Sequence, residues 1–344
     1  ALFGGSGDDS VVGVLGNGTN HGPSSLFNVI SGKDGEDTLY SIINSGSNVA
    51  GALNKSVIKG GADDDTILTD IVAGGIWKTT TVSNLFGGTG NDMITAQTKD
   101  GASEDGGSTF TVEHRLEGGS GSDLLDAQIL VTGKNASSSG MSLTNHALGG
   151  AGDDTVIGTI GIDAKRVSDA QLGSGTNMLQ GGGGSDRLTS EFLWGAEGVG
   201  HLSGGGDNDT LTVVGGSGNL LRGDQGNDIL DLTASAGVDV LQFQLAKNGG
   251  SDRVIGWDIA TDQLNILELA GQEIADPLGA GVLAGLAGRV ELVDDGTDVL
   301  MVLDGGTRVI FAGIGTGAVE SLEQLFADVD TQLISEAALW DSPV

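Results

Sequence analysis

The sequence has no cysteine, only three prolines and few aromatic residues among its 344 positions. Without cysteine there are no disulfides, no thiol catalysis and no cysteine-ligated zinc or iron–sulfur centres. The scarcity of proline excludes collagen and proline-rich linkers. No apolar run reaches the roughly 18 residues that a membrane-spanning helix needs, so we expect no membrane span.

Positive charge is also scarce. Fifteen Lys and Arg residues face 47 acidic residues, which gives a net charge of −32. Such a surface repels phosphate backbones, so nucleic acid is not an expected partner. Aspartate makes up 35 of the 47 acids, and glycine reaches 63 residues, far above its usual share of about 7%. Aspartate and glycine together are typical of tight turns or of sites for hard cations.

An eight-residue pattern recurs nine times at spacings of 19 to 32 residues. Its first position is glycine, at Gly4, Gly32, Gly60, Gly87, Gly118, Gly149, Gly181, Gly204 and Gly223. Its sixth position is always aspartate, at Asp9, Asp37, Asp65, Asp92, Asp123, Asp154, Asp186, Asp209 and Asp228. The eighth position, and the position two residues before the pattern, are aliphatic in all nine copies. An agreement this complete is a very specific signal of a structural repeat.

The pattern predicts a strand, a tight turn and a second strand. Glycines permit positive φ and close backbone approach, and the flanking aliphatic residues point inward at the period of two of a strand. A single coil cannot bury its aliphatic face, so neighbouring coils must stack. Stacking brings the sixth-position aspartates to about 4.8 Å from one another, where bare carboxylates repel. A divalent cation between the turns removes the repulsion, and calcium prefers carboxylate and carbonyl oxygens.

The turns resemble the calcium-binding nonapeptide of RTX (hemolysin-type) proteins over residues 2–235. The resemblance implies that the nine aspartates and the carbonyls of the glycine turns bind up to eight calcium ions between successive turns. The implied fold is all-β, a right-handed parallel β-solenoid with calcium turns along one edge, followed by a small β-rich cap. The family's usual roll has two calcium turns per coil of about 18 residues. Here the opposite turn of the last coil has Leu220 where aspartate is expected, so we expect that edge to bind no metal.

We predict two domains, the RTX solenoid over 1–236 and a β-rich cap over 237–344. The stretch 252–266 resembles the segment that follows the calcium roll in RTX exoproteins. Strands are expected at 290–293, 299–303 and 309–311, with a turn at 304–306. Val319, Leu322, Leu325 and Phe326 have helical spacing. By resemblance, the end of the chain carries an uncleaved signal for the type I secretion machinery.

Residues of other possible sites are interpreted as structural. His114, His146 and His201 precede calcium turns by three or four residues and are expected on one face of the stack. Trp77, Trp194, Trp257 and Trp340 are interpreted as packing residues, with a sugar-binding surface as the alternative. No catalytic triad or metal-binding histidine motif is recognisable. We therefore expect a protein that is not an enzyme.

Two functions remain open from the sequence. The first is an extracellular calcium-binding structural protein of the bacterial cell surface, such as a surface-layer, adhesin or fibre subunit. The second is the C-terminal calcium-binding secretion and folding module of a larger exoenzyme, such as a protease, a lipase or a polysaccharide-active enzyme. The choice depends on whether Ala1 is the natural start. Because the first calcium turn begins only three residues after Ala1, we expect a partner to cover the first coil. The candidate partners are a second copy of the chain, in a layer or fibre, and a surface polysaccharide.

Overall fold

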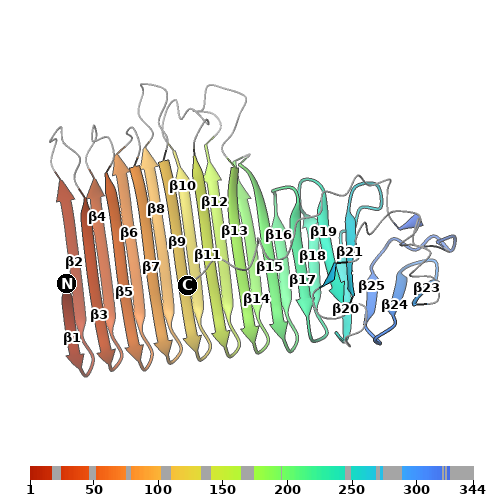
Figure 1. Ribbon diagram of the computed structural model, residues 1–344, viewed down its shortest axis with the longest axis horizontal. Helices are drawn as coiled ribbons and strands as arrows, with labels where there is room; N and C mark the ends of the chain where they lie inside the picture. Colours follow the sequence, from red (N-terminus) through yellow and green to blue (C-terminus); the bar gives the residue numbers. More distant parts are fainter. Residues whose placement is uncertain are drawn as a thin grey trace.

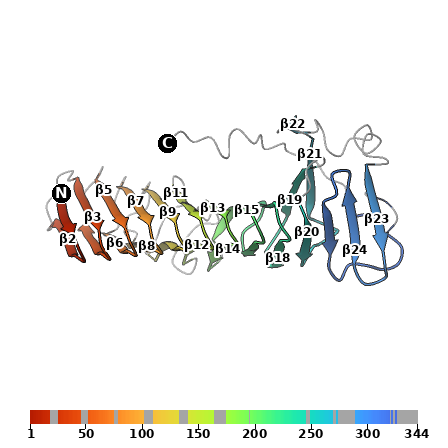
Figure 2. The same ribbon diagram turned by 90° about the horizontal axis from the view of Figure 1, so that it is seen from below.

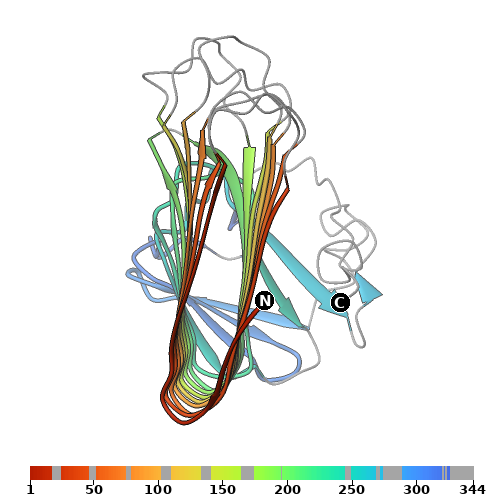
Figure 3. The ribbon, with the colours of Figure 1, turned by 90° about the vertical axis from the view of Figure 1, so that its left-hand side faces the viewer.

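The computed structural model describes 1–17, 25–45, 52–74, 79–101, 110–132, 141–163, 174–194, 196–244, 249–268, 272–273, 289–319, 321 and 324–325. Across these residues the protein is all-β, and all of the described strands belong to two long sheets that face each other along a single stack (Figure 1, Figure 3). Within the described part of the chain, no helix is long and apolar enough to cross a membrane.

The first sheet contains the odd-numbered strands of the solenoid, in the order in which they occur along the chain. These are β1 (Leu2–Ser6), β3 (Leu26–Asp34), β5 (Leu53–Ala62), β7 (Thr79–Thr89), β9 (Phe110–Ser120), β11 (Ser142–Ala151), β13 (Ser174–Gly183), β15 (Glu197–Gly206), β17 (Asn219–Asp224), β19 (Asp239–Gln244) and β21 (Gln263–Glu268). The short β22 (Gln272–Glu273) pairs antiparallel with β21 at the end of this sheet.

The second sheet contains the even-numbered strands. These are β2 (Ser10–Asn17), β4 (Thr38–Ser45), β6 (Thr66–Gly74), β8 (Met93–Gly101), β10 (Leu124–Val131), β12 (Thr155–Ile162), β14 (Arg187–Leu193), β16 (Thr210–Val214), β18 (Ile229–Ala234) and β20 (Ser251–Ile255). All neighbouring pairs from β2 to β20 are parallel, so each strand returns one coil further along the stack. The parallel β-solenoid predicted from the sequence is confirmed.

The core is built from the two aliphatic positions of the repeat. In the first sheet Ile30 aligns with Ile58, and in the second sheet Leu39 aligns with Ile67. From the second coil onward all of these side chains are at most 1% exposed, whereas Leu2 of the first coil is 39% exposed. Each buried aliphatic side chain contributes about 1.5–3 kcal/mol of hydrophobic stabilisation, so the repeat itself specifies the stacking.

A second column inside the solenoid is polar. Asn28, Ser56, Ser83, His114, Asn145 and Asn177 occupy one register position of the first sheet and are all buried. Several of them hydrogen-bond across the interior, as Asn177 does to Ser190 at 2.9 Å and Asn28 does to Ser41 at 2.9 Å. Buried polar groups of this kind fix the register of a coil, because a slip would leave them without partners.

The parallel sheets continue beyond residue 236. β17 pairs with β19 and β19 with β21, while β18 pairs with β20, all in parallel. The boundary predicted at residue 236 therefore lies within the sheets, which run on to about residue 268. The stack ends where β25 (Arg308–Phe311) adds parallel to β20 and is followed by the antiparallel β24 (Val299–Leu303) and β23 (Val290–Asp294) (Figure 2).

The end of the stack confirms the three strands predicted between 290 and 311 and the turn at 304–306. Trp257 is 5% exposed, lies 5.2 Å from the Phe311 ring and donates its indole N–H to the Leu325 carbonyl at 3.3 Å. Val319 and Leu325 are buried in the same cluster. The other residues of the expected helix, Leu322 and Phe326, and the end predicted to carry the secretion signal lie outside the described residues.

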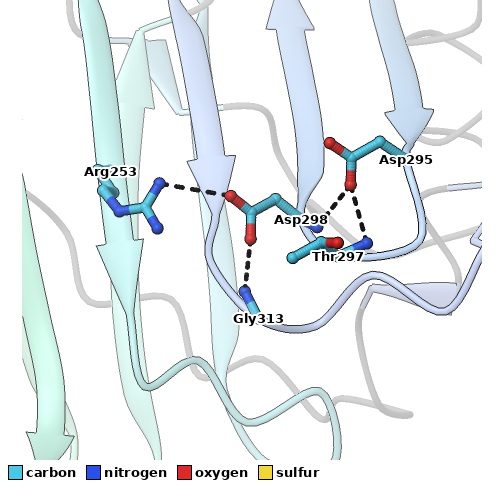
Figure 4. A network of polar contacts seen from close by, with 5 residues as sticks. All are labelled: Arg253, Asp295, Thr297, Asp298 and Gly313. Atoms are coloured by element: carbon cyan, nitrogen blue, oxygen red, sulfur yellow. Dashed lines mark hydrogen bonds and ion pairs between the residues drawn. The ribbon is translucent and has the colours of Figure 1, made fainter.

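Carboxylates at the tips of β23 and β24 hold this end together. Asp295 accepts hydrogen bonds from the N–H groups of Thr297 and Asp298, and Asp298 joins Gly313 to Arg253 of the solenoid (Figure 4). Asp294 Oδ2 accepts the N–H groups of Thr316, Ala318 and Val319 at 2.9–3.1 Å. The terminal hairpin is thus attached to the last coil by polar contacts as well as by the apolar cluster.

Candidate calcium ladder

The nine predicted turns all lie on one edge, where each odd-numbered strand passes into the next even-numbered strand (Figure 1). Gly88 and Gly90 show why these turns need glycine, since both have φ near +125°. Close approach is the second reason. A methyl group added at Gly87 would overlap Asp92 Oδ2 and would lie 2.6 Å from the carbonyl oxygen of Gly118 in the next coil. Carboxylate and carbonyl oxygens of successive turns therefore converge at the first position of the repeat.

The sixth-position aspartates form a continuous column. In every pair of neighbouring turns, the backbone N–H of one aspartate donates to Oδ1 of the next, at 2.8–3.1 Å. From Asp37 to Asp228 these side chains are at most 3% exposed. One carboxylate oxygen is therefore used by the backbone in each turn, and the other faces the space between turns.

Among the described residues, the Oδ2 atoms of the column aspartates from Asp37 to Asp228 lack hydrogen-bond partners. Oδ2 of Asp37, Asp65, Asp92, Asp123, Asp154, Asp186, Asp209 and Asp228 is buried without any hydrogen-bond partner from the protein. A buried carboxylate oxygen without a partner is strongly unfavourable. With turn carbonyls beside it, the arrangement offers the hard oxygen ligands that calcium prefers, and it places them between successive turns. The residues of the column therefore fit calcium.

Burial and mutual repulsion raise the pKa of the column carboxyls from Asp65 to Asp228. The pKa rises to about 7 for Asp65 and to about 8 for Asp209, first because burial disfavours the charged form and second because neighbouring aspartates repel it. For Asp92, Asp123, Asp154 and Asp186 burial raises the pKa to about 6. Without a cation the protein environment thus opposes ionisation of the column, and a bound divalent cation would reverse that preference.

The structure adds a tenth turn that the sequence reasoning missed. Asp228 N–H donates to Asp252 Oδ1 at 3.1 Å, and Val254 aligns with Leu230. Gly250 also stands at the fourth position, with φ of 95°. Glycine, aspartate and valine at positions four, six and eight were the available signal. The turn was overlooked because positions one and two are not glycine. The next strand places Val309 opposite Asp252, so the column ends there.

The fifth position of the repeat carries an outer ladder of hydrogen bonds. Where it is Asp or Asn, its side-chain oxygen accepts the fifth-position N–H of the next coil, as in Asn91 N–H to Asp64 at 2.7 Å and Ser122 N–H to Asn91 at 2.8 Å. The same contact recurs at Asp8, Asp153, Asn208 and Asn227. Its direction is opposite to that of the inner column, so the two ladders tie each turn to both neighbours.

The edge opposite the calcium turns has different contacts, and the strand register there corrects one residue of the sequence prediction. Strand register places Asn219, rather than the predicted Leu220, in line with Asp239 and Asp262. Asn219 donates to Asp239 Oδ1 at 2.8 Å, and Asp262 accepts the N–H groups of Asp239 at 3.0 Å and Asp258 at 2.8 Å. Protein donors therefore satisfy these carboxylates, in contrast to the calcium edge.

In four calcium turns a residue other than glycine has the positive φ that glycine has at the same position in other turns. Lys33 and Asp224 at the second position have φ of 102° and 73°, and Asp63 and Asp207 at the fourth position have φ of 75° and 70°. Side chains with a Cβ are strained in this region, so these turns are held by their neighbours rather than by local preference.

The histidines do not gather on one face. His114 points into the core, is 0% exposed and accepts or donates one hydrogen bond with Thr98 at 2.9 Å, and burial lowers its pKa to about 3. His146 and His201 lie on the outer side, both in register with Met178. The described residues contain no group of three or more His, Asp or Glu side chains that could hold a metal by themselves. The calcium edge instead combines one carboxylate per turn with backbone oxygens.

Comparison with known proteins agrees with this geometry. A family model for the RTX calcium-binding nonapeptide repeat matches residues 2–19 and 140–164, in four copies. These matches include the turns of Asp9 and Asp154. The chain thus carries RTX repeats, which bind calcium. No curated protein matches the sequence.

Proposed function

We propose that the chain is an extracellular structural protein of the bacterial cell surface whose solenoid folds when calcium binds after type I secretion. The observation that carries the proposal is the buried column of carboxylate oxygens without partners. Calcium is scarce inside cells and abundant outside, so the column keeps the chain unfolded before export and orders it afterwards. RTX repeats are typical of secreted bacterial proteins, which supports this location.

Ten aspartates, from Asp9 to Asp252, leave nine gaps between successive turns, and we propose one calcium ion in each. Nine calcium ions carry a charge of +18 and would reduce the net charge of the protein from −32 to −14. The elongated stack then acts as a calcium-stiffened rod. We further propose that it is not an enzyme, because His114 is neutral and enclosed while the outer histidines lie on the other side of the same sheet.

Circular dichroism across a calcium titration tests this proposal. The chain is expected to be largely disordered in excess chelator and to gain β-structure cooperatively on addition of calcium, with magnesium much less effective. Asp123→Asn keeps the Oδ1 acceptor but removes the charge, and it is expected to weaken the two adjacent sites. Ser122→Ala, one residue away, serves as the matched control. A fully folded chain in chelator contradicts the proposal.

The first coil supports a second candidate, a module of a larger exoenzyme. Phe3, Val12 and Val14 are all more than half exposed there, as is Phe27 of the second coil, and the outer edges of β1 and β2 have no partner strand in the described structure. A segment preceding residue 1 in a longer chain would cover this end, and so would a second copy in a layer or fibre. The mass of the secreted protein and its sedimentation in saturating calcium distinguish the two arrangements.

A further inference from the structure

Trp194 occupies a backbone conformation that is unfavourable for its side chain. It stands at the first central position of the tight turn between β14 and β15, where the Ala196 N–H donates to the Leu193 carbonyl at 3.2 Å. Its φ is 59°. Turns with positive φ at this position are normally formed by Gly, Asn or Asp. A strained outlier of this kind is a reason to look for a function.

The indole ring is held from one side and open on the other. It lies over Gly161 of β12, where an added methyl group would be 2.9 Å from the ring atom Cζ3 and 3.0 Å from Leu130 Cδ2. Gly161 and Leu130 are neighbours in the outer face of the second sheet. Trp194 nevertheless remains 52% exposed. The glycine thus makes room for a ring that presents part of its surface to solvent.

A polar pair lies beside the ring on the same outer face. Thr159 Oγ1 donates to Glu191 Oε2 at 3.4 Å, and the two residues are in register on β12 and β14. Thr159 is two residues from Gly161 along β12, which corresponds to about 7 Å. A six-membered sugar ring and one of its hydroxyl groups span a distance of this order. Because its proton is donated to Glu191, the Thr159 hydroxyl is left as an acceptor, and the Glu191 carboxylate is an acceptor as well, so the pair can receive hydrogen bonds from sugar hydroxyl groups.

We propose that Trp194, Glu191 and Thr159 form a binding site for a neutral pyranose oligosaccharide. The ring packs against the C–H face of one sugar unit, while Glu191 and Thr159 hydrogen-bond to its hydroxyl groups. The net charge of −32 disfavours anionic glycans. Ala196 of the same turn also lines a surface pocket of roughly 630 Å³, together with Glu197 and Ser217. The turn therefore lies beside an open pocket on the surface of the solenoid.

Calorimetric titration of the calcium-saturated chain with cellohexaose, maltohexaose and chitohexaose tests the proposal, with oligogalacturonate as the acidic comparison. At least one neutral oligosaccharide is expected to bind. Trp194→Gly is expected to lower its affinity by about tenfold or more while leaving the unfolding temperature unchanged or raised, because glycine relieves the turn. Glu191→Gln keeps the shape of the side chain and is also expected to weaken binding. Phe27→Ala removes an aromatic ring of nearly the same exposure, 53%, and is expected to leave the affinity unchanged.

Several outcomes would overturn the site. One is that none of the three neutral oligosaccharides binds at millimolar concentration. Another is that binding survives Trp194→Gly, and a third is that Phe27→Ala weakens binding equally. If Trp194→Gly lowers the unfolding temperature as well as the affinity, the Glu191→Gln variant distinguishes a binding role from a packing role. Loss of affinity at unchanged stability in Glu191→Gln supports the site, whereas unchanged affinity shows that the tryptophan only packs on Gly161.

Discussion

Asp228 and Asp252 are joined by the same contact that links every earlier pair of calcium turns, a backbone N–H to Oδ1 hydrogen bond of 3.1 Å. The pair is separated by 24 residues and spans the boundary predicted at residue 236. Burial and the neighbouring Asp228 raise the pKa of Asp252 above its ordinary value. The aspartate column therefore extends one turn into the region expected to be a separate cap.

Replacement of Asp252 by Asn is expected to remove one calcium ion from the total bound and to loosen the last coil. The amide keeps the Oδ1 acceptor for the Asp228 N–H but loses the negative charge that calcium requires. Asp262→Asn on the opposite edge is the control, because protein donors already satisfy both of its oxygens. Calorimetric stoichiometry of the two variants measures the difference. Equal stoichiometry in Asp252→Asn and the unaltered chain would exclude Asp252 as a ligand.

The sequence allowed prediction of the nine aspartates and the aliphatic ladder because both obey a strict local spacing. Asp252 escaped prediction because its turn lacks glycine at the first two positions. Asn219 escaped it because Gly215, Gly216 and Gly218 match the glycine pattern but are shifted by one residue, so that counting from Gly215 leads to Leu220. Only the strand register, with Asn219 opposite Asp239 and Val254 opposite Leu230, shows their places. The pairing of β20 with β25 joins strands more than 50 residues apart, and no local pattern encodes such a contact.

The calcium-free coil is expected to become less stable as pH rises. Burial raises the folded-state pKa to about 7 in Asp65 and about 8 in Asp209, above the unfolded value near 4. The folded coil therefore binds more protons than the unfolded chain between about pH 4 and pH 8. The contribution of these carboxyls to the free energy of unfolding is fully present below about pH 4 and is lost as pH rises to about 8. Calcium must reverse the trend, because protons compete for the same oxygens.

Circular dichroism in calcium-depleted buffer measures this effect. More β-structure is expected near pH 4 than near pH 8, and the order is expected to invert when calcium is saturating. Asp37→Asn, Asp65→Asn and Asp92→Asn together remove three of the titrating or repelling carboxyls and are expected to flatten the calcium-free profile. A calcium-free chain that is more structured at high pH than at low pH would contradict the assigned environment of the column.

Lys33→Gly is expected to stabilise the calcium-bound protein by about 1 kcal/mol. A φ of 102° strains a lysine by about 1–3 kcal/mol, whereas glycine adopts it freely and costs only about 0.5–1 kcal/mol of additional chain entropy. Lys55→Gly removes the same charge from a regular strand and is expected to destabilise the protein by about 1 kcal/mol. Urea unfolding in saturating calcium compares them. A loss of stability in both variants would show that the turn tolerates lysine without strain.

Asp294 is expected to hold the segment after β25 against the end of the stack. Its Oδ2 accepts three backbone N–H groups, from Thr316, Ala318 and Val319, and these bonds hold the pKa of its carboxyl well below the usual range. Because the folded pKa is lowered, this contribution is present above the unfolded value near 4 and is lost as pH falls further.

Asp294→Ala removes the acceptor for all three N–H groups, so their amides are expected to exchange with deuterium much faster, together with that of the buried neighbour Leu325. The calcium column lies on another edge and is expected to keep its protection. Asp304→Ala, which removes an exposed ion pair with Arg289 on the same hairpin, is the control. Hydrogen exchange followed by mass spectrometry resolves the segments. Unchanged exchange at 316–319 in Asp294→Ala would mean that the apolar contacts of Val319 and Leu325 alone hold this end of the molecule.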